Sequence, residues 1–234
     1  MTIAVSQTSG QAWASGTTVS TTGITTVSGS LLALVYLGYK ATTFGGNTAT
    51  PTDSKSCTWS GLVASELTKT AFAQAWYNVG GSRGASHTAT VTLDGTAQAS
   101  AVLIEITGYK TSGSTDASNY ADSSTGTATV TSSATTNARC LVIGAAITRG
   151  NFGTVNWNAN GTITGSNGTD IYTDSDGTTH TAGSSVWYRI VSATGAQTAS
   201  RSHDTGTDWA ALVFSIVEAA SSPLLLRRRH GLSN

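Results

Sequence analysis

The chain has 234 residues, of which 10% are charged and 38% are hydrophobic, and its formal net charge at pH 7 is zero. This length allows one large all-β domain or two modules of about 100 residues each. Zero net charge excludes long-range attraction of nucleic acid or of a charged membrane surface. The N-terminal stretch has no basic segment followed by an apolar one, so we expect no secretory signal. The longest apolar runs are about half as long as a membrane span requires.

Strands are predicted along the whole chain, and helices are not. Residues 31–39 form a continuous apolar run, which is typical of a strand central to a sandwich. In residues 86–95, His87, Ala89 and Val91 point to one face and threonines to the other, and the final Asp-Gly predicts a turn. No window repeats apolar residues at helical spacing over three capped turns. The pattern therefore predicts an all-β protein.

The two halves of the chain repeat the same order of landmarks. A Trp-Tyr pair at residues 76–77 recurs at residues 187–188, an offset of 187 − 76 = 111 residues. In both halves a glycine-containing turn, a Thr/Ser-rich strand and an apolar closing strand follow the pair. We interpret this as a duplicated unit of about 110 residues with six or seven strands, the size and strand count of an antiparallel β-sandwich module. The two units can form separate sandwiches or pair into one pseudo-symmetric sandwich, and the sequence does not choose.

The expected organisation has four parts. A first sandwich unit (1–110) is followed by a polar connection rich in turn-forming residues (111–127). A second, similar unit (128–220) and a C-terminal arm (221–234) complete the chain.

No catalytic or cofactor motif stands out in the sequence. The one G-x-S-x-G match, residues 80–84, lies in a turn between two predicted strands and not between a strand and a helix, as a nucleophile elbow requires. The four histidines form none of the usual metal-binding spacings. We therefore expect a non-enzymatic protein without a cofactor. Asp174 and Asp176 are a weak calcium candidate, because they resemble the start of a calcium loop that is not completed; an ordinary turn is favoured. Glu105 interrupts an apolar run and is expected at an outer face or an interface.

The cysteines and tryptophans allow more than one interpretation. Cys57 and Cys140 are interpreted as buried free thiols, with a bridge between them left open. Four of the six tryptophans lie in strand patterns and are assigned to the core. Trp13 and Trp209 are harder to assign and are the candidates for stacking on a sugar ring, in which case the protein would be a carbohydrate-binding module.

The chain resembles a known group of proteins over about residues 15 to 220. The resemblance rests on LLALVYLGY, CTWSG, the Trp-Tyr strand and TDWAALVFSIVEA. Similar Thr/Ser/Gly-rich β-sandwich sequences occur in virion structural proteins of tailed bacteriophages and in repeated modules of bacterial surface proteins. The resemblance implies a jelly-roll-like or immunoglobulin-like sandwich with a structural or adhesive role and no catalytic residues. Surface modules usually follow a signal peptide, which favours the phage interpretation here.

The C-terminal arm is the expected docking segment. Pro223 ends the preceding strand, and three leucines and three arginines follow it. We expect the leucines to dock in a groove on a neighbouring subunit, and the arginines to pair with its carboxylates or to donate hydrogen bonds to its backbone. These residues are Leu224, Leu225, Leu226, Arg227, Arg228 and Arg229. The N-terminal strand near Ile3 and Val5 is a second candidate, for pairing at a sheet edge.

These features lead us to expect a virion structural protein, in the first place a capsid decoration or cement protein. Its expected location is the virion, after synthesis in the host cytoplasm. Its partners would be the major capsid protein, other virion subunits and copies of itself, for example in a trimer. A phage tail or tail-fibre component and a carbohydrate-binding or adhesion module are the alternatives. No membrane contact is expected, and nucleic acid is not an expected partner, because three arginines supply few phosphate contacts.

Overall fold

The computed structural model describes residues 2–39, 51–64, 70–150, 161–175, 182–203 and 206–220. Over these ranges it confirms the predicted all-β class, and they contain no helix long and apolar enough to cross a membrane. The strands of the first half are β1 (Ala4–Ser20), β2 (Leu31–Tyr39), β3 (Thr52–Asp53), β4 (Ser60–Ala64), β5 (Ala71–Val79) and β6 (Ala89–Thr107). The later strands are β7 (Thr115–Ser123), β8 (Ala128–Thr135), β9 (Cys140–Gly150), β10 (Thr162–Ile163), β11 (Ser166–Asn167), β12 (Thr169–Ser175), β13 (Ala182–Val191), β14 (Gly195–Arg201) and β15 (Gly206–Val217).

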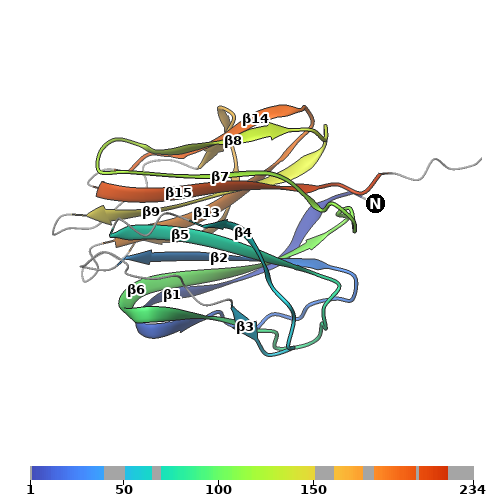
Figure 1. Cartoon of the computed structure of the whole chain (residues 1–234), viewed down its shortest axis with the longest axis horizontal. Coiled ribbons are helices and arrows are strands. Elements are labelled where there is room, and N and C mark those ends of the chain that lie inside the picture. The colour runs from blue at the N-terminus through green and yellow to red at the C-terminus, as the bar shows by residue number, and fades with distance from the viewer. Residues whose placement is uncertain are drawn as a thin grey trace, which may run out of the picture.

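These strands form three antiparallel sheets. The first has the order β1-β6-β2-β5-β4, with β3 paired to the start of β6. The second has the order β12-β13-β9-β15-β7, and the third has the order β11-β10-β14-β8. In Figure 1 the sheets lie one above another, from β8 and β14 at the top to β3 at the bottom.

Both halves use the same pairing scheme, which confirms the predicted duplication. In the first half the long strands β1 and β6 pair along their whole length, with register shifts that divide each into two parts. In the second half the corresponding parts are separate strands, because β7 pairs with β15 and β8 pairs with β14. The pairs β6–β2 and β2–β5 correspond to β15–β9 and β9–β13, and β3–β6 corresponds to β10–β14.

This scheme is close to that of a jelly roll. Each half has eight segments when β1 and β6 are each counted as two and the short strand β11 is left out as an addition. The first segment then pairs with the eighth, and the second pairs with the seventh. The third pairs with both the eighth and the sixth, as in jelly rolls. The fifth segment, β4 or β12, pairs with the sixth instead of the fourth. Each half is thus a jelly-roll-like sandwich with one rearranged strand.

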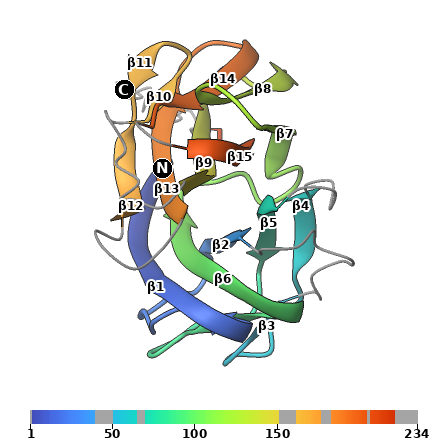
Figure 2. The same ribbon diagram turned by 90° about the vertical axis from the view of Figure 1, so that its left-hand side faces the viewer.

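The two large sheets pack face to face and share a central core. In β2, Leu31, Val35 and Leu37 belong to this core, while Leu32 and Leu34 face the interior of the first half. The strand β9 alternates in the same way between the central core and the interior of the second half. Both strands are therefore buried on both faces, which explains why their sequences are apolar without alternation. Figure 2 shows the resulting stack from one end, with β1 and β6 curving around the bottom.

Two local predictions differ from the structure. The Asp-Gly pair at 94–95 does not end a strand, because β6 continues through it. Pairing moves from Gly16↔Ala97 to Thr18↔Thr92, so the extra residues of β6 form a bulge at which the sheet turns a corner. The expected polar connection, 111–127, contains strand β7. Among the described strands β7 pairs only with β15, and it has one buried residue, Ala117, so its sequence carries no apolar alternation.

Glu105 lies inside the molecule, which the sequence did not indicate. Its side chain is fully buried on β6. One carboxylate oxygen accepts a hydrogen bond from the Ser6 hydroxyl at 2.7 Å, and the other accepts one from the backbone N–H of Val27 at 2.6 Å. The carboxylate therefore fastens β1 and the segment before β2 to the first sheet.

Candidate functional site

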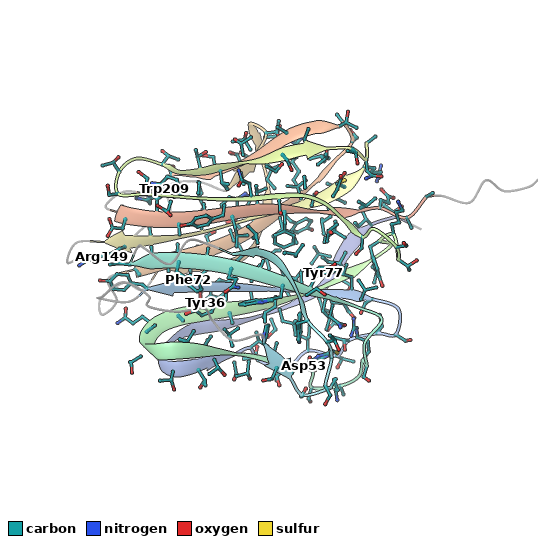
Figure 3. The ribbon with its side chains drawn as sticks, in the orientation of Figure 1. Tyr36, Asp53, Phe72, Tyr77, Arg149 and Trp209 are labelled. Carbon is teal, nitrogen blue, oxygen red and sulfur yellow. The ribbon has the colours of Figure 1, made fainter. Side chains whose placement is uncertain are left out.

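A tight loop after β3 is organised by the carboxylate of Asp53. This carboxylate accepts hydrogen bonds from the backbone N–H of Lys55 at 2.7 Å and of Cys57 at 3.1 Å. It also accepts one from the indole N–H of Trp59 at 2.7 Å. Ser56 completes the turn with a φ of 56°, in the left-handed region that non-glycine residues seldom adopt. The loop thereby turns Cys57 back toward Asp53. Asp53 is the last residue of β3, and Figure 3 shows it at the bottom of the stack.

His87 faces this loop from the segment that leads into β6. Its side chain and that of Asp53 are both completely buried. The ring Nδ1 lies 3.0 Å from the Thr26 hydroxyl, and Nε2 lies 3.3 Å from the Asp53 Oδ1 atom. Nε2 has no hydrogen bond of good geometry. A buried ring nitrogen is thus directed at a carboxylate without a well-formed bond to it.

Cys57 completes a group of three potential ligands. Its thiol is free and half-buried, and its Sγ atom lies 3.3 Å from the carbonyl oxygen of Ser82 and 3.4 Å from Nη1 of Arg83. One donor atom from each of Asp53, Cys57 and His87 lies within 4.8 Å of the others. Carboxylate oxygen, thiol sulfur and imidazole nitrogen therefore converge on one point.

The protonation of these groups argues against a nucleophilic thiol. Burial, with the Asp53 carboxylate as a second cause, raises the pKa of the Cys57 thiol above its ordinary value. Burial lowers the pKa of His87, and the nearby Asp53 offsets this only in part. Cysteine catalysis requires a thiolate, usually stabilised by a protonated histidine. Here the thiol and the imidazole are both held neutral at pH 7.

A polar pocket adjoins the group. It has a volume of about 620 Å³ and is lined by residues from three segments, at positions 56–58 and 60, 77–82, and 111 and 113–115. Cys57 is among its lining residues, and so is Tyr77, which Figure 3 labels on β5. Of the three potential ligands, Cys57 is therefore the one that reaches this open pocket.

The structure places several of the predicted site residues away from this group. Trp209 is 6% exposed and donates its indole N–H to the carbonyl of Thr125, so its ring offers little surface to a sugar. Ile3, just before β1, is fully buried and belongs to the central core. Val5 lies in β1, pairs with Ile106, and belongs to the outermost strand of the first sheet.

The remaining predicted residues have no described side chain. The docking arm, Leu224 to Arg229, lies outside the described residues, as does Asp176. Trp13 and Asp174 lie in β1 and β12, but only their backbones are described. The two cysteines are both free, as interpreted, although Cys57 is only half-buried.

Sequence reasoning missed the three-ligand group. Asp53, Cys57 and His87 are separated by 3 and 29 residues, a spacing that matches no metal motif. Each also had an ordinary explanation, as a turn residue, a strand cysteine and an alternating strand position. The nearest signal was a histidine on the apolar face of a strand, which marks a buried imidazole that needs a partner.

Comparisons with protein-family models, with curated proteins and with solved structures found no match.

Proposed function

We propose that this protein is a non-enzymatic structural component of a tailed-phage virion, in particular a capsid decoration protein. The observation that carries the proposal is the stacking of two jelly-roll-like units through one shared apolar core. Jelly rolls recur in viral capsid proteins, where they serve as building blocks. This support is architectural, since a fold can host several functions.

The shared core suits a part that must hold its neighbours at fixed positions. Strands of both halves contribute to it, including β2, β5 and β6 from the first half and β9, β13 and β15 from the second. Sliding or hinging the halves would expose this apolar surface, so the two units behave as one rigid block. A rigid block that repeats on a symmetric shell gains binding strength from many weak contacts.

Sheet edges and the C-terminal arm are the proposed contact surfaces. β1 and β4 end the first sheet, and β7 and β12 end the second. Backbone groups on an outer edge can pair with a strand of the major capsid protein or of another copy. The arm from Leu224 to Arg229 stays a prediction, with docking on a neighbouring subunit as its role.

Binding to capsids tests the proposal. The full chain and a version ending at Ala220 are mixed with capsids stripped of accessory proteins, and co-sedimentation and resistance to heat are measured. We expect the full chain to bind and to stabilise the capsids, and the shortened chain to bind at least tenfold more weakly. A third version with the three arginines replaced by alanine separates the contribution of charge from that of the leucines. Absence of binding by the full chain contradicts the capsid role and leaves a tail or tail-fibre role to be tested on tails.

A carbohydrate-binding function is the second candidate, and the pocket beside β5 favours it. Jelly rolls also occur in lectins. The pocket lining combines the aromatic ring of Tyr77 with Asn78 and several serine and threonine residues, a composition suited to hydroxyl groups. Glycan-array binding that is lost in Tyr77→Ala and kept in Trp209→Phe would support this function over the capsid role.

A further inference from the structure

We infer that Asp53, Cys57 and His87 form a binding site for a thiophilic divalent cation, with zinc as the best-matched ion. This inference goes beyond the proposed structural function and is independent of it. Zinc sites in proteins use thiolate, imidazole and carboxylate ligands, most often four in a tetrahedral arrangement. The described residues supply one ligand of each kind from two separate segments, the loop after β3 and the segment before β6.

The spacing of the ligand atoms fits such an ion. A zinc ion lies about 2.0–2.1 Å from a nitrogen or oxygen ligand. At the tetrahedral angle, two such ligand atoms are therefore roughly 3.3–3.4 Å apart. His87 Nε2 and Asp53 Oδ1 are 3.3 Å apart. The Cys57 sulfur lies within 4.8 Å of both atoms, and tetrahedral coordination needs it about 3.5 Å from each, so its half-buried side chain has to move by at most about 1.3 Å.

The ligands are already oriented by neighbouring groups. Metal-binding histidines usually place their second ring nitrogen against a hydrogen-bond partner. Here Nδ1 of His87 lies 3.0 Å from the Thr26 hydroxyl, and this hydroxyl also lies 3.3 Å from the carbonyl of Gly84. When the hydroxyl donates to Gly84, Nδ1–H donates to Thr26 and the lone pair of Nε2 points at Asp53. The indole of Trp59 fixes the carboxylate from its other side.

This arrangement explains an otherwise unfavourable contact. A fully buried lone pair facing a carboxylate oxygen at 3.3 Å is repulsive unless a proton or a cation lies between them. The proton alternative gives a bond of poor geometry, because Nε2 has no aligned hydrogen-bond partner. A cation between the two atoms satisfies both.

The charge of the site is compatible with a dication. Zinc together with one thiolate and one carboxylate has no net charge, so the guanidinium of Arg83 near the sulfur faces a neutral centre. Arg83 is also held by the carbonyl oxygen of Ser30 at 2.8 Å. Since Cys57 lines the polar pocket, a water molecule can supply the fourth ligand from that side.

Glycine at position 81 leaves the space that the sulfur occupies. A Cβ atom there would lie 2.7 Å from Sγ of Cys57 and 2.7 Å from Oδ1 of Asn78. Any larger residue would displace the thiol from the group.

Cobalt substitution provides the test. The full-length protein is freed of metal with a chelator and titrated with Co²⁺, and then with Zn²⁺ in competition. We expect one ion per chain, a thiolate-to-cobalt charge-transfer band and the visible bands of four-coordinate cobalt. Zinc should remove these bands and raise the melting temperature.

Matched variants separate this site from other metal-binding groups. Cys57→Ser should abolish the charge-transfer band, and Cys140→Ser, at the other free cysteine, should keep it. Trp59→Phe keeps the aromatic core but removes the N–H that fixes Asp53, and should weaken binding by about 10–100-fold. The inference is overturned if the wild-type protein shows no charge-transfer band, or if Cys57→Ser keeps it. It is also overturned if Trp59→Phe binds zinc as tightly as the wild type.

Discussion

A buried pair of serines joins the two halves of the molecule and offers a direct probe of how they pack. Ser100 on β6 and Ser184 on β13 are fully buried, and their hydroxyl groups are 2.8 Å apart although the residues are 84 positions apart in sequence. Replacing one serine with alanine leaves the other hydroxyl buried without this partner. The cost of such an unpaired group is about 1–3 kcal/mol.

The double replacement should cost less than the sum of the two single ones. With both hydroxyls removed, two methyl groups face each other and no polar group is left unpaired. We therefore expect Ser100→Ala and Ser184→Ala each to lower the free energy of unfolding by about 1–3 kcal/mol, and the pair to show a coupling of roughly 1 kcal/mol or more. Urea denaturation, monitored by tryptophan fluorescence, measures all four free energies.

A control cycle pairs Ser100→Ala with Ser215→Ala. Ser215 is also buried, but it bonds to the backbone of Ala117. Ser184 lies opposite Ile147 and Ser215 opposite Val142 on the same strand, β9, which places them about 16 Å apart along it. The control replacements should be additive. Additivity in the Ser100–Ser184 cycle itself would refute the packing of the two halves described above.

Three further predictions concern individual buried or ionised groups. Glu105→Ala should destabilise the protein by about 2–3 kcal/mol in urea denaturation, because it leaves the N–H of Val27 unpaired, while Glu105→Gln should cost less because the amide oxygen still accepts that bond. Burial, with nearby carboxylates, raises the pKa of Cys140 to about 11. A thiol reagent at pH 8 should therefore modify Cys57 first and reach Cys140 only when the protein unfolds. Equal modification rates for the two cysteines would contradict the burial of Cys140. Burial opposes ionisation of Asp116, but hydrogen bonds from the neighbouring turn outweigh it and lower its pKa. The ionised carboxylate therefore stabilises the fold fully above the unfolded pKa of about 3.9, and this contribution is lost as the pH falls through the lower folded pKa. Asp116→Ala should lower the free energy of unfolding by about 1–2 kcal/mol at pH 7, and the difference from the wild type should vanish in acid.

The fold could be predicted where the sequence pattern matches burial. The unbroken apolar run of β2 indicated a strand central to a sandwich, and the repeated Trp-Tyr pair in β5 and β13 indicated the duplication. The sequence could not show that the halves share a core, because either face of an apolar strand can pack against either partner. Strand β7 was missed because an edge strand has little buried surface and no apolar pattern.

The candidate metal site could not be predicted because it depends on tertiary contacts. Asp53 and His87 meet only because β3 pairs with the start of β6, where Asp53 lies opposite Ala89. A short strand of two residues leaves almost no signal in the sequence. Local patterns thus gave each residue an ordinary role, and their common role required the register of that pairing.

The fold and the proposed function both depend on the claim that the two repeats behave as one rigid block. Native-state hydrogen exchange tests it most directly, by comparing the amides of β2 in the first half with those of β9 in the second. A shared core predicts that the slowest amides of both strands exchange with the same opening free energy and the same dependence on denaturant. Two distinct free energies, one for each half, would contradict the claim and show that the units unfold independently.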